Sequence, residues 1–536
     1  MFAFLKNSKF NKEPLNETIA RTWQSIEPCS KKAFIWMFAI INIVFFWHTV
    51  VFFFGNHDWG HIKNGFGIGW SVFDGRWGAG LIQQAVGGDI LPVLNNLFCF
   101  AGFCLAMIAL AKYWELPKNT LIYTIFGLFI MLLPYTYPWL QFVSSETYFW
   151  NILLIVWASI SADKKRLFPQ IAAFVIFVFS LGCYPATIEA IVVIFLGRCL
   201  LTVWFDNPSL KDFIKKYWLH AFNIFFSFII FTVLFEWMKK RGLFINYSSV
   251  EPVTFAVLLQ NFIKLPHALW DTFISDSSYM PTWFKLWLET SALFIIALML
   301  KKSWRQNLLT VLLVATLLIA SQICELLSTY YYAAQMRIDF FAVPYILALG
   351  WTVLLRQKEN FWKNIALIMM LFAVYYSGLQ AFRDQKVKYF DKQYEMKVFD
   401  DIRARIKANP NFSPNKQYNI VMIGCLLKPE ERTPFDRYHQ HIKIENTWVS
   451  FVPEWNAKEF FDFYEKDSFV RMSYPDINYL LSDDSLHRLD INYLLNSAHP
   501  WPHPNSVYID RHNIYIILDQ EKLDILKERI RATMLH

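Results

Sequence analysis

Long apolar stretches recur along most of this chain, and they constrain its fold more than any other feature. A helix that spans a bilayer needs about 20 mostly apolar residues. We expect about eleven such helices, some of them short, at about 33–54, 90–111, 120–134, 146–160, 170–183, 187–205, 218–237, 286–300, 307–327, 338–355 and 361–380. The sequence therefore predicts an α-helical polytopic membrane protein.

The composition favours lipid over water as the solvent of this chain. Of the 536 residues, 55% are hydrophobic and 18% are charged, whereas soluble domains carry about 25% charged residues. So little polar surface cannot cover a water-soluble protein of this size. The net charge of +8 does not indicate a nucleic-acid partner, because the basic residues cluster in short loops between apolar segments. That placement is typical of membrane topology.

The charges of the short loops predict the orientation. Lys and Arg cluster in alternate loops, whereas the loops near Pro134–Trp139 and Cys183–Thr187 contain neither. Basic loops stay on the cytoplasmic side, so the N-terminal segment 1–32 is expected to be cytoplasmic. With an odd number of spans, the C-terminus lies on the outer side.

Three segments on the expected outer side are long: the loops 55–89 and 238–285, and the tail 382–536. In the tail the charge rises, and strand-like runs alternate with helix-like runs. These runs are Tyr418–Ile423, Ala457–Glu465, Tyr508–Leu518 and Glu521–Arg531. We predict a transmembrane domain over 33–381 and an extracytoplasmic α/β domain over 382–536.

A candidate catalytic carboxylate follows the first expected span. Asp58 lies between His57 and Trp59, beside a membrane in which ionised side chains are costly. A carboxylate held there by a helix end can accept a proton from a substrate hydroxyl. The alternative is a solvated loop aspartate without a catalytic role.

Several short motifs follow Asp58 in a fixed order. They are Asp58-Trp59-Gly60, Trp70, Asp74-Gly75-Arg76, the loop from Pro134 to Glu146 with its Ser-Glu pair, and the turn Leu181–Ala186. Their order resembles the GtrII-type bacterial O-antigen glucosyltransferases of the GT-C class, over about the first 200 residues and in layout beyond. One position departs from that pattern, because His57 replaces the first member of the family's acidic pair.

This resemblance implies a GT-C-like membrane domain in the bacterial inner membrane, with the C-terminal domain in the periplasm. It implies transfer of glucose, or another hexose, from a polyprenyl-phosphate carrier to a glycan or lipid-linked acceptor, such as O-antigen lipopolysaccharide, on the outer face. The expected reaction is an inverting displacement with Asp58 as general base, supported by Glu146. Donor, acceptor and membrane lipids are the expected partners.

A departing phosphate requires fixed cations. The candidates on the expected outer side are Arg76, Lys239, Lys240, Arg241 and Arg337. Arg76 can bind phosphate through two hydrogen bonds, or it can extend its charge to the interface as a snorkelling side chain. The Lys239–Arg241 run opposes the orientation rule, so it is explained by phosphate, by anionic headgroups or by a different local topology.

Three further carboxylates have weaker functional arguments. Asp74 is expected to support Arg76 rather than react, and Glu189 is expected to stabilise a helix N-terminus. Glu146 is expected either to contact the acceptor or a metal, or to end a helix. The seven cysteines have no zinc spacing. No cofactor is implied, although an Asp–Glu pair leaves a divalent metal open.

Two other classes of function are alternatives. A transporter or lipid flippase for a glycan precursor would place ionisable residues near the middle of the membrane and show internal repeats. Here the charges gather at the outer ends of the expected spans, and no such repeat is found. The second alternative is an assembly protein that recruits partners through its tail.

Overall fold

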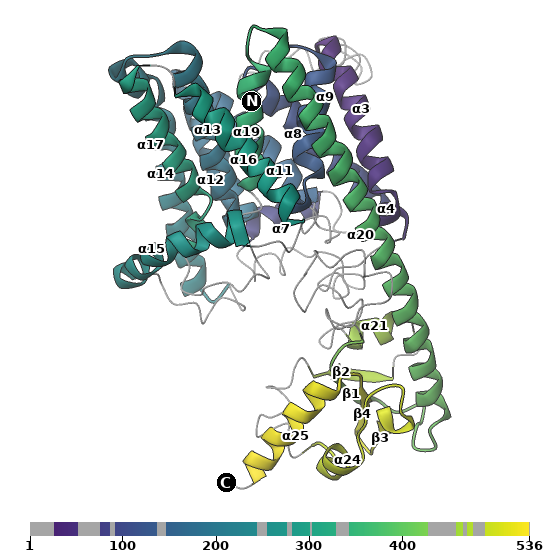
Figure 1. The fold of residues 1–536 in the computed structure, drawn as a ribbon. Helices are drawn as coiled ribbons and strands as arrows, with labels where there is room; N and C mark the ends of the chain where they lie inside the picture. Colours follow the sequence, from purple (N-terminus) through teal and green to yellow (C-terminus); the bar gives the residue numbers. More distant parts are fainter. Residues whose placement is uncertain are drawn as a thin grey trace, which may run out of the picture.

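The computed structural model describes residues 26–51, 76–85, 92–136, 146–243, 254–275, 281–300, 303–327, 342–426, 457–464, 469–474 and 488–534. A bundle of long helices and a small C-terminal sheet make up its two parts (Figure 1). Helix α20 (Asn360–Ala408) runs from the bundle to the sheet. We call the end of the bundle nearer the sheet the sheet-side end, and the other the far end.

Each expected span overlaps a helix of the bundle. These helices are α3 (Pro28–Val44), α4 (Phe46–Val51), α8 (Pro92–Tyr113), α9 (Thr120–Leu132), α11 (Glu146–Ala162), α12 (Leu167–Cys183), α13 (Ile188–Asp206), α14 (Leu210–Lys240), α16 (Thr282–Met299), α17 (Trp304–Ala320), α19 (Val343–Leu355) and the first part of α20. Within the described ranges, four helical stretches are long and apolar enough to cross a membrane, and five shorter apolar helices accompany them. The chain is thus a helical membrane protein, and eleven spans stay a prediction.

Short elements gather at the sheet-side end. They are α7 (Trp77–Ala85), η2 (Pro134–Thr136), η4 (Pro185–Thr187), α15 (Phe255–Trp270), the π-helical turn η5 (Asp271–Ser275) and α18 (Ile323–Leu326). Helix α15 lies across the end of the bundle rather than along it (Figure 1). Its residues Leu265 and Ala268 are buried, whereas Phe262 and Ile263 are exposed. Helix α15 therefore exposes large apolar side chains at this end of the bundle, as a helix that lies in a membrane interface does.

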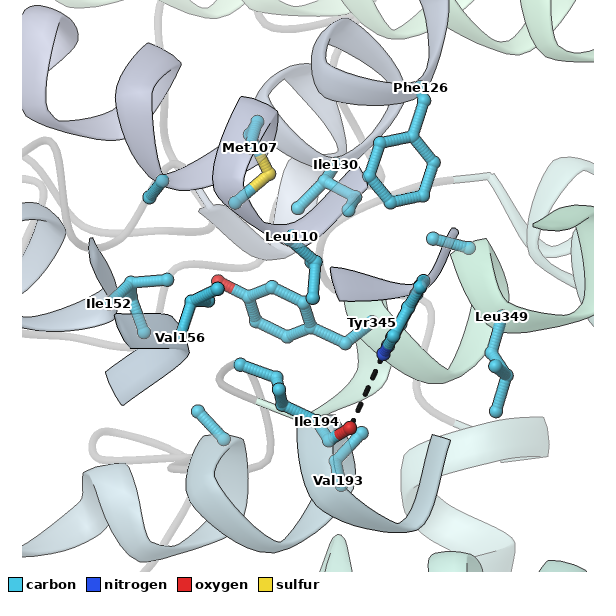
Figure 2. Packing of buried hydrophobic residues seen from close by; sticks show 14 of the residues in the cluster. Met107, Leu110, Phe126, Ile130, Ile152, Val156, Val193, Ile194, Tyr345 and Leu349 are labelled. Carbon is cyan, nitrogen blue, oxygen red and sulfur yellow. Dashed lines mark hydrogen bonds between the residues drawn. The ribbon is translucent and has the colours of Figure 1, made fainter. Parts of the chain in front are cut away.

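The core of the bundle is packed by large side chains from helices far apart in the sequence. Lipid is as apolar as leucine, so close packing rather than hydrophobic transfer holds such a core together. In Figure 2 the dashed line is the hydrogen bond from Trp114 Nε1 to the Ile194 carbonyl oxygen, at 3.3 Å. Gly197 permits this contact, because a methyl group there would lie 2.9 Å from the Trp114 ring. Around it Figure 2 shows Met107, Leu110, Phe126, Ile130, Ile152, Val156, Val193, Tyr345 and Leu349.

Ion pairs join three elements at the far end. Glu115, in the loop between α8 and α9, pairs with Arg198 of α13 and, at 2.9 Å, with Arg356 after α19. Arg356 also donates to the Trp114 carbonyl oxygen at 3.3 Å and lies 4.2 Å from the centroid of the Phe205 ring. Glu115 has φ +57°, a costly value for a side chain with a Cβ. We call Glu115, Arg198 and Arg356 the Glu115 clamp.

The C-terminal sheet has strand order β2-β1-β4-β3. Strand β1 pairs in parallel with β2 and β4, and β3 pairs antiparallel with β4. The strands are β1 (Tyr418–Ile423), β2 (Val470–Ser473), β3 (Val507–Ile509) and β4 (Asn513–Ile517). The end of α20 and α21 (Ala457–Tyr464) pack on one face, and α24 (Ile491–Asn496) and α25 (Gln520–Met534) on the other. Three α/β/α layers result.

Two details of this region differ from the expectation. Helix α20 passes without a break through residue 382, where we expected the tail to begin. The segment between Gly378 and Pro410 contains no Gly or Pro, and its many Lys, Arg and Gln residues are good helix formers. The strand-like run Tyr508–Leu518 contains a hairpin instead of one strand. Asp510 turns the chain there, since its carboxylate accepts from the His512 and Asn513 backbone N–H groups, both at 2.6 Å.

Candidate functional site

Arg76 meets two tyrosines at the sheet-side end of the bundle. It immediately precedes α7, and its guanidinium donates a hydrogen bond to the Tyr148 hydroxyl at 3.2 Å. The same guanidinium lies 4.9 Å from the centroid of the Tyr184 ring. The two tyrosine rings meet edge to face, with centroids 5.0 Å apart. Because Tyr148 and Tyr184 are 5% and 8% exposed, they hold the cation against a largely buried surface. We call these three residues the Arg76 cluster.

Two glycines fix the position of α7 against the end of α12. A methyl group at Gly78 would lie 2.8 Å from the Cys183 backbone nitrogen. A methyl group at Gly182 would collide with the Trp77 ring. Trp77 also meets Phe179 edge to face, with ring centroids 5.8 Å apart. The two elements therefore interlock, and this contact places Arg76 over the ring of Tyr184.

Hydrogen bonds hold the turn that follows α12. Asn151, one turn after Tyr148 on α11, donates to the Ser180 carbonyl oxygen at 3.0 Å. The Thr187 hydroxyl donates to the Tyr184 carbonyl oxygen at 2.7 Å. These bonds fix both tyrosines relative to each other. Glu189 lies in the first turn of α13 and is 1% exposed, at the helix N-terminus where its structural role was predicted.

The cationic run Lys239–Arg241 lies at the end of α14. Lys239 and Lys240 form the last turn of this helix, and Arg241 caps it. The Arg241 guanidinium lies 5.6 Å from the centroid of the Trp237 ring. Cations at a helix C-terminus stabilise the helix dipole. Stabilisation of the α14 C-terminus is therefore a further explanation for these three cations. It stands beside the two ligands that the sequence suggested, phosphate and anionic lipid headgroups.

The remaining predicted residues lie wholly or partly outside the described structure. His57, Asp58, Trp59, Asp74 and Arg337 are outside the described residues. Glu146 is the first residue of α11, so its backbone begins a helix rather than ending one. The structure thus places Arg76 and Lys239–Arg241, and the catalytic assignments of Asp58 and Glu146 stay predictions.

Sequence reasoning missed Tyr148 and Tyr184. Tyr148 lies two residues after Glu146, and Tyr184 lies inside the turn that carried part of the family resemblance. Interface tyrosines are common in membrane proteins, so neither stood out by residue type. The available signal was that Tyr184 lies within one quoted motif and Tyr148 directly beyond another, because motifs that share one site converge in space.

The Arg76 cluster can bind an anion at the end of the bundle. A guanidinium is a planar cation with several N–H donors, and its flat face stacks on a ring. The low-dielectric surroundings strengthen its attraction for a charged oxygen. In the described part of the chain, no three His, Cys, Asp or Glu side chains gather as metal ligands.

Long apolar helices, with a half-buried arginine held by two buried tyrosines at their ends, define a membrane protein with a polar site at one end of its bundle. A family model described as Glucosyl transferase GtrII matches residues 48–355, which is more than half of the chain. The chain belongs to this family of glucosyl transferases, and the resemblance found in the sequence is confirmed. The matched span includes the whole Arg76 cluster. Comparisons with curated proteins and with solved structures gave no match.

Proposed function

We propose that this protein transfers glucose, or another hexose, from a polyprenyl-phosphate carrier to a glycan acceptor on the outer face of the bacterial inner membrane. The acceptor class that fits the family is O-antigen lipopolysaccharide or a related lipid-linked glycan. The observation that carries the proposal is the Arg76 cluster. It places a guanidinium, held by the Tyr148 hydroxyl and the Tyr184 ring, at the end of apolar helices, where the phosphate of a membrane-bound donor would lie.

The reaction is an inverting displacement at the anomeric carbon. The acceptor hydroxyl oxygen forms the new glycosidic bond, and the bond between that carbon and the donor phosphate oxygen breaks. Asp58 accepts the hydroxyl proton, and polyprenyl phosphate departs. Arg76 stabilises the charge that develops on the departing phosphate. Glu146 supports the acceptor, and Lys239–Arg241 with Arg337 provide further positive charge near the headgroups.

The proposed topology places the sheet-side end on the outer, periplasmic side and the far end in the cytoplasm. In this arrangement residues 1–32 are cytoplasmic, the transmembrane domain covers 33–381, and residues 382–536 form a periplasmic α/β domain. The reacting groups then lie where a water-borne acceptor and a membrane-borne donor can meet. The α/β layers stand on the same side as the site, within reach of an incoming glycan.

Two substitutions test the proposal in membranes supplied with polyprenyl-phosphate glucose and acceptor glycan. Asp58→Asn keeps the size of the side chain and removes its basicity, so transfer should fall by about 10²–10⁴-fold. Arg76→Lys keeps the charge but loses the two-pronged geometry, so the KM for the donor should rise. Mass analysis of the acceptor, one hexose heavier after reaction, provides the readout.

If Asp58→Asn transferred the hexose at the normal rate, Asp58 would not be the general base, but hexose transfer would still be the reaction. Failure of the wild-type protein to add a hexose to any glycan would remove the reaction class itself. Movement of the donor across reconstituted vesicles without a new glycosidic bond would favour the transporter reading instead.

A further inference from the structure

An apolar groove opens in the wall of the bundle near its sheet-side end. It has a volume of about 380 Å³ and lies between α13, α14, α15, α17 and α18. Val192, Phe195, Ile224 and Phe228 are among the residues that line it, and Thr316 is the one lining residue with a polar side chain. Ligand pockets in proteins have volumes of this order, about 300–1,000 Å³. The lining favours a hydrocarbon occupant.

One end of the groove adjoins the segment that carries the Arg76 cluster. Ile188, which lines the groove, is the first residue of α13 and follows directly after η4. Ile323 of α18 also lines the groove, and the neighbouring Cys324 Sγ lies 4.0 Å from the Ala186 carbonyl oxygen of η4. Tyr184, whose ring lies under the Arg76 guanidinium, immediately precedes η4. A cationic site and an apolar groove therefore flank the same turn.

The groove also faces the surrounding lipid. Phe225 of α14 lines it and is 61% exposed, and Leu258 of α15 lines it at the sheet-side end and is 37% exposed. Helix α15 lies across that end with its apolar side exposed (Figure 1). A chain that lies in the bilayer can thus enter the groove sideways, beneath α15, without passing through water.

We propose that this groove holds the prenyl chain of the sugar donor next to its phosphate, with Arg76 as the partner of that phosphate. Arg76 lies on one side of η4, and the apolar residues Ile188 and Val192 line the groove on the other side. An amphiphile with an anionic head and a branched hydrocarbon tail fits this order, with its head at Arg76 and its tail in the groove. The inference rests on the proposed function, because it takes the donor to be a polyprenyl phosphosugar. It adds a binding site for the tail and a lateral route of entry through the membrane.

The groove orients the donor rather than extracting it from water. The prenyl chain is already surrounded by hydrocarbon in the bilayer, so transfer into the groove gains little hydrophobic free energy. What the groove provides is close packing that fixes the direction of the chain, and hence the position of the anomeric carbon at the site. Blocking the groove should therefore impair long-chain donors and spare donors whose chain ends before it reaches Val192.

Two substitutions fill the groove from two different helices. Ala221 of α14 and Thr316 of α17 both line it and are exposed within it, so Ala221→Trp and Thr316→Trp add bulk without entering the core. Matched controls place the same side chain on the same helices outside the groove: Val233→Trp and Val311→Trp, at positions 59% and 51% exposed. Each variant is assayed with a long-chain polyprenyl-phosphate glucose and with a water-soluble analogue of one or two isoprene units.

We expect the groove variants to lower kcat/KM for the long-chain donor by about tenfold or more, equivalent to about 1.4 kcal/mol. Turnover of the short-chain donor and all rates of the controls should stay near wild type. Equal losses with both donors, or wild-type rates with the long-chain donor in both groove variants, would overturn the groove assignment while leaving hexose transfer intact. Absence of transfer by the wild-type protein with either donor would instead overturn the proposed function. Crosslinking from a photoreactive prenyl chain to peptides of α13, α14 or α18 provides a second readout if one variant fails to fold.

Discussion

At the scale of single residues, Arg76 is held by neighbours that the sequence does not place beside it. The motif around it predicted a phosphate-binding arginine, and the structure adds the Tyr148 hydroxyl and the Tyr184 ring as its supports. These two tyrosines are 72 and 108 positions away from Arg76 in the chain. Single-sequence reasoning cannot pair residues at such distances unless the packing of their helices is known. Residue type predicted the cation, and only the fold identified its partners.

The first prediction concerns the Tyr148 hydroxyl. Tyr148→Phe removes the acceptor that fixes the Arg76 guanidinium, and hydrogen bonds to charged groups contribute about 1.5–3 kcal/mol. We expect the KM for the donor to rise by about tenfold, with a smaller effect on kcat and with normal membrane insertion. Steady-state kinetics with varied donor concentration measure this split.

Tyr113→Phe is the matched control, because the Tyr113 hydroxyl is buried and has no hydrogen-bond partner among the described residues. Removing that hydroxyl should leave kinetics unchanged. Equal effects of the two substitutions would mean that Tyr148 acts only through packing.

The second prediction concerns the Glu115 clamp and pH. The hydrogen bond from Arg198 lowers the pKa of the Glu115 carboxyl below its ordinary value of 4.5. A carboxyl whose folded-state pKa is lowered stabilises the fold above its unfolded pKa and loses this contribution as pH falls through the folded value. Glu115→Gln should therefore lower stability at pH 7 by about 1 kcal/mol, a value reduced by the partial exposure of Glu115.

Thermal unfolding in detergent at several pH values tests the clamp. The difference in Tm between wild type and Glu115→Gln should be largest at neutral pH and shrink below about pH 4.5. Asp206→Asn breaks the exposed pair with Lys216, 3.4 Å long, and should change stability by less than about 0.5 kcal/mol. A Tm difference that grows on acidification would contradict the assigned role of Glu115.

At the scale of elements, the site exists because α7 interlocks with the end of α12. Gly78 and Gly182 are the positions at which a side chain would separate the two. Because η4 and α13 follow α12 directly in the chain, this contact also fixes where α7 lies relative to η4 and the start of α13. Gly182 lies inside a motif that carried the family resemblance, and Gly78 lies two residues after another. Their packing gives a physical reason for both glycines.

The third prediction concerns this interlock. Gly78→Ala forces a methyl group to within 2.8 Å of the Cys183 backbone nitrogen, and such overpacking costs about 1–3 kcal/mol. We expect α7 to shift, so that transfer falls while the rest of the bundle stays folded. Gly378→Ala is the control, since its methyl group would lie 3.7 Å or more from its neighbours and should raise helix stability by about 0.5–1 kcal/mol.

Activity and thermal unfolding of both variants decide the question. Full activity of Gly78→Ala would show that the placement of Arg76 tolerates movement of α7. Loss of activity in Gly378→Ala would show that the assay responds to any glycine substitution in the bundle.

The apolar pattern of the sequence predicted where helices occur but not where some of them end. Spans such as 187–205 match α13 closely, because lipid requires a continuous apolar helix whose length the bilayer sets. Helix α20 extends far beyond its expected end, since hydropathy marks where a chain leaves the lipid and not where its helix stops. The hairpin within Tyr508–Leu518 was missed for a related reason: a short turn held by Asp510 interrupts the strand-like pattern only briefly.

At the scale of the whole molecule, the two ends of the bundle differ in their chemistry. The far end carries ion pairs between neighbouring helices, among them the Glu115 clamp and the bonds from Lys112 and Lys118 to Glu27. The sheet-side end carries the Arg76 cluster, the interfacial helix α15 and the groove. A transporter must open both ends in turn, and these ion pairs tie neighbouring helices together at the far end.

The fourth prediction concerns the orientation of these ends. In a background without Cys29, Cys324 and Cys425, a membrane-impermeant maleimide applied to spheroplasts should label Gln393→Cys, in α20 beyond the bundle. It should label Lys165→Cys, in the loop between α11 and α12, only after permeabilisation. The reverse pattern would place the Arg76 cluster in the cytoplasm and contradict the proposed reaction geometry.

Helix α20 also makes the C-terminal layers respond to the bilayer. Its apolar stretch ends at Arg383 and the helix continues to Ala408, so about 25 residues, or roughly 37 Å, extend past the lipid. A rod of that length is a lever that pivots at the membrane surface. A change in tilt of about 10° is well within the range that bilayer thickness imposes on spanning helices. It would move the C-terminal end of α20 by about 6 Å. A thicker or thinner membrane would therefore move the sheet sideways over the mouth of the bundle.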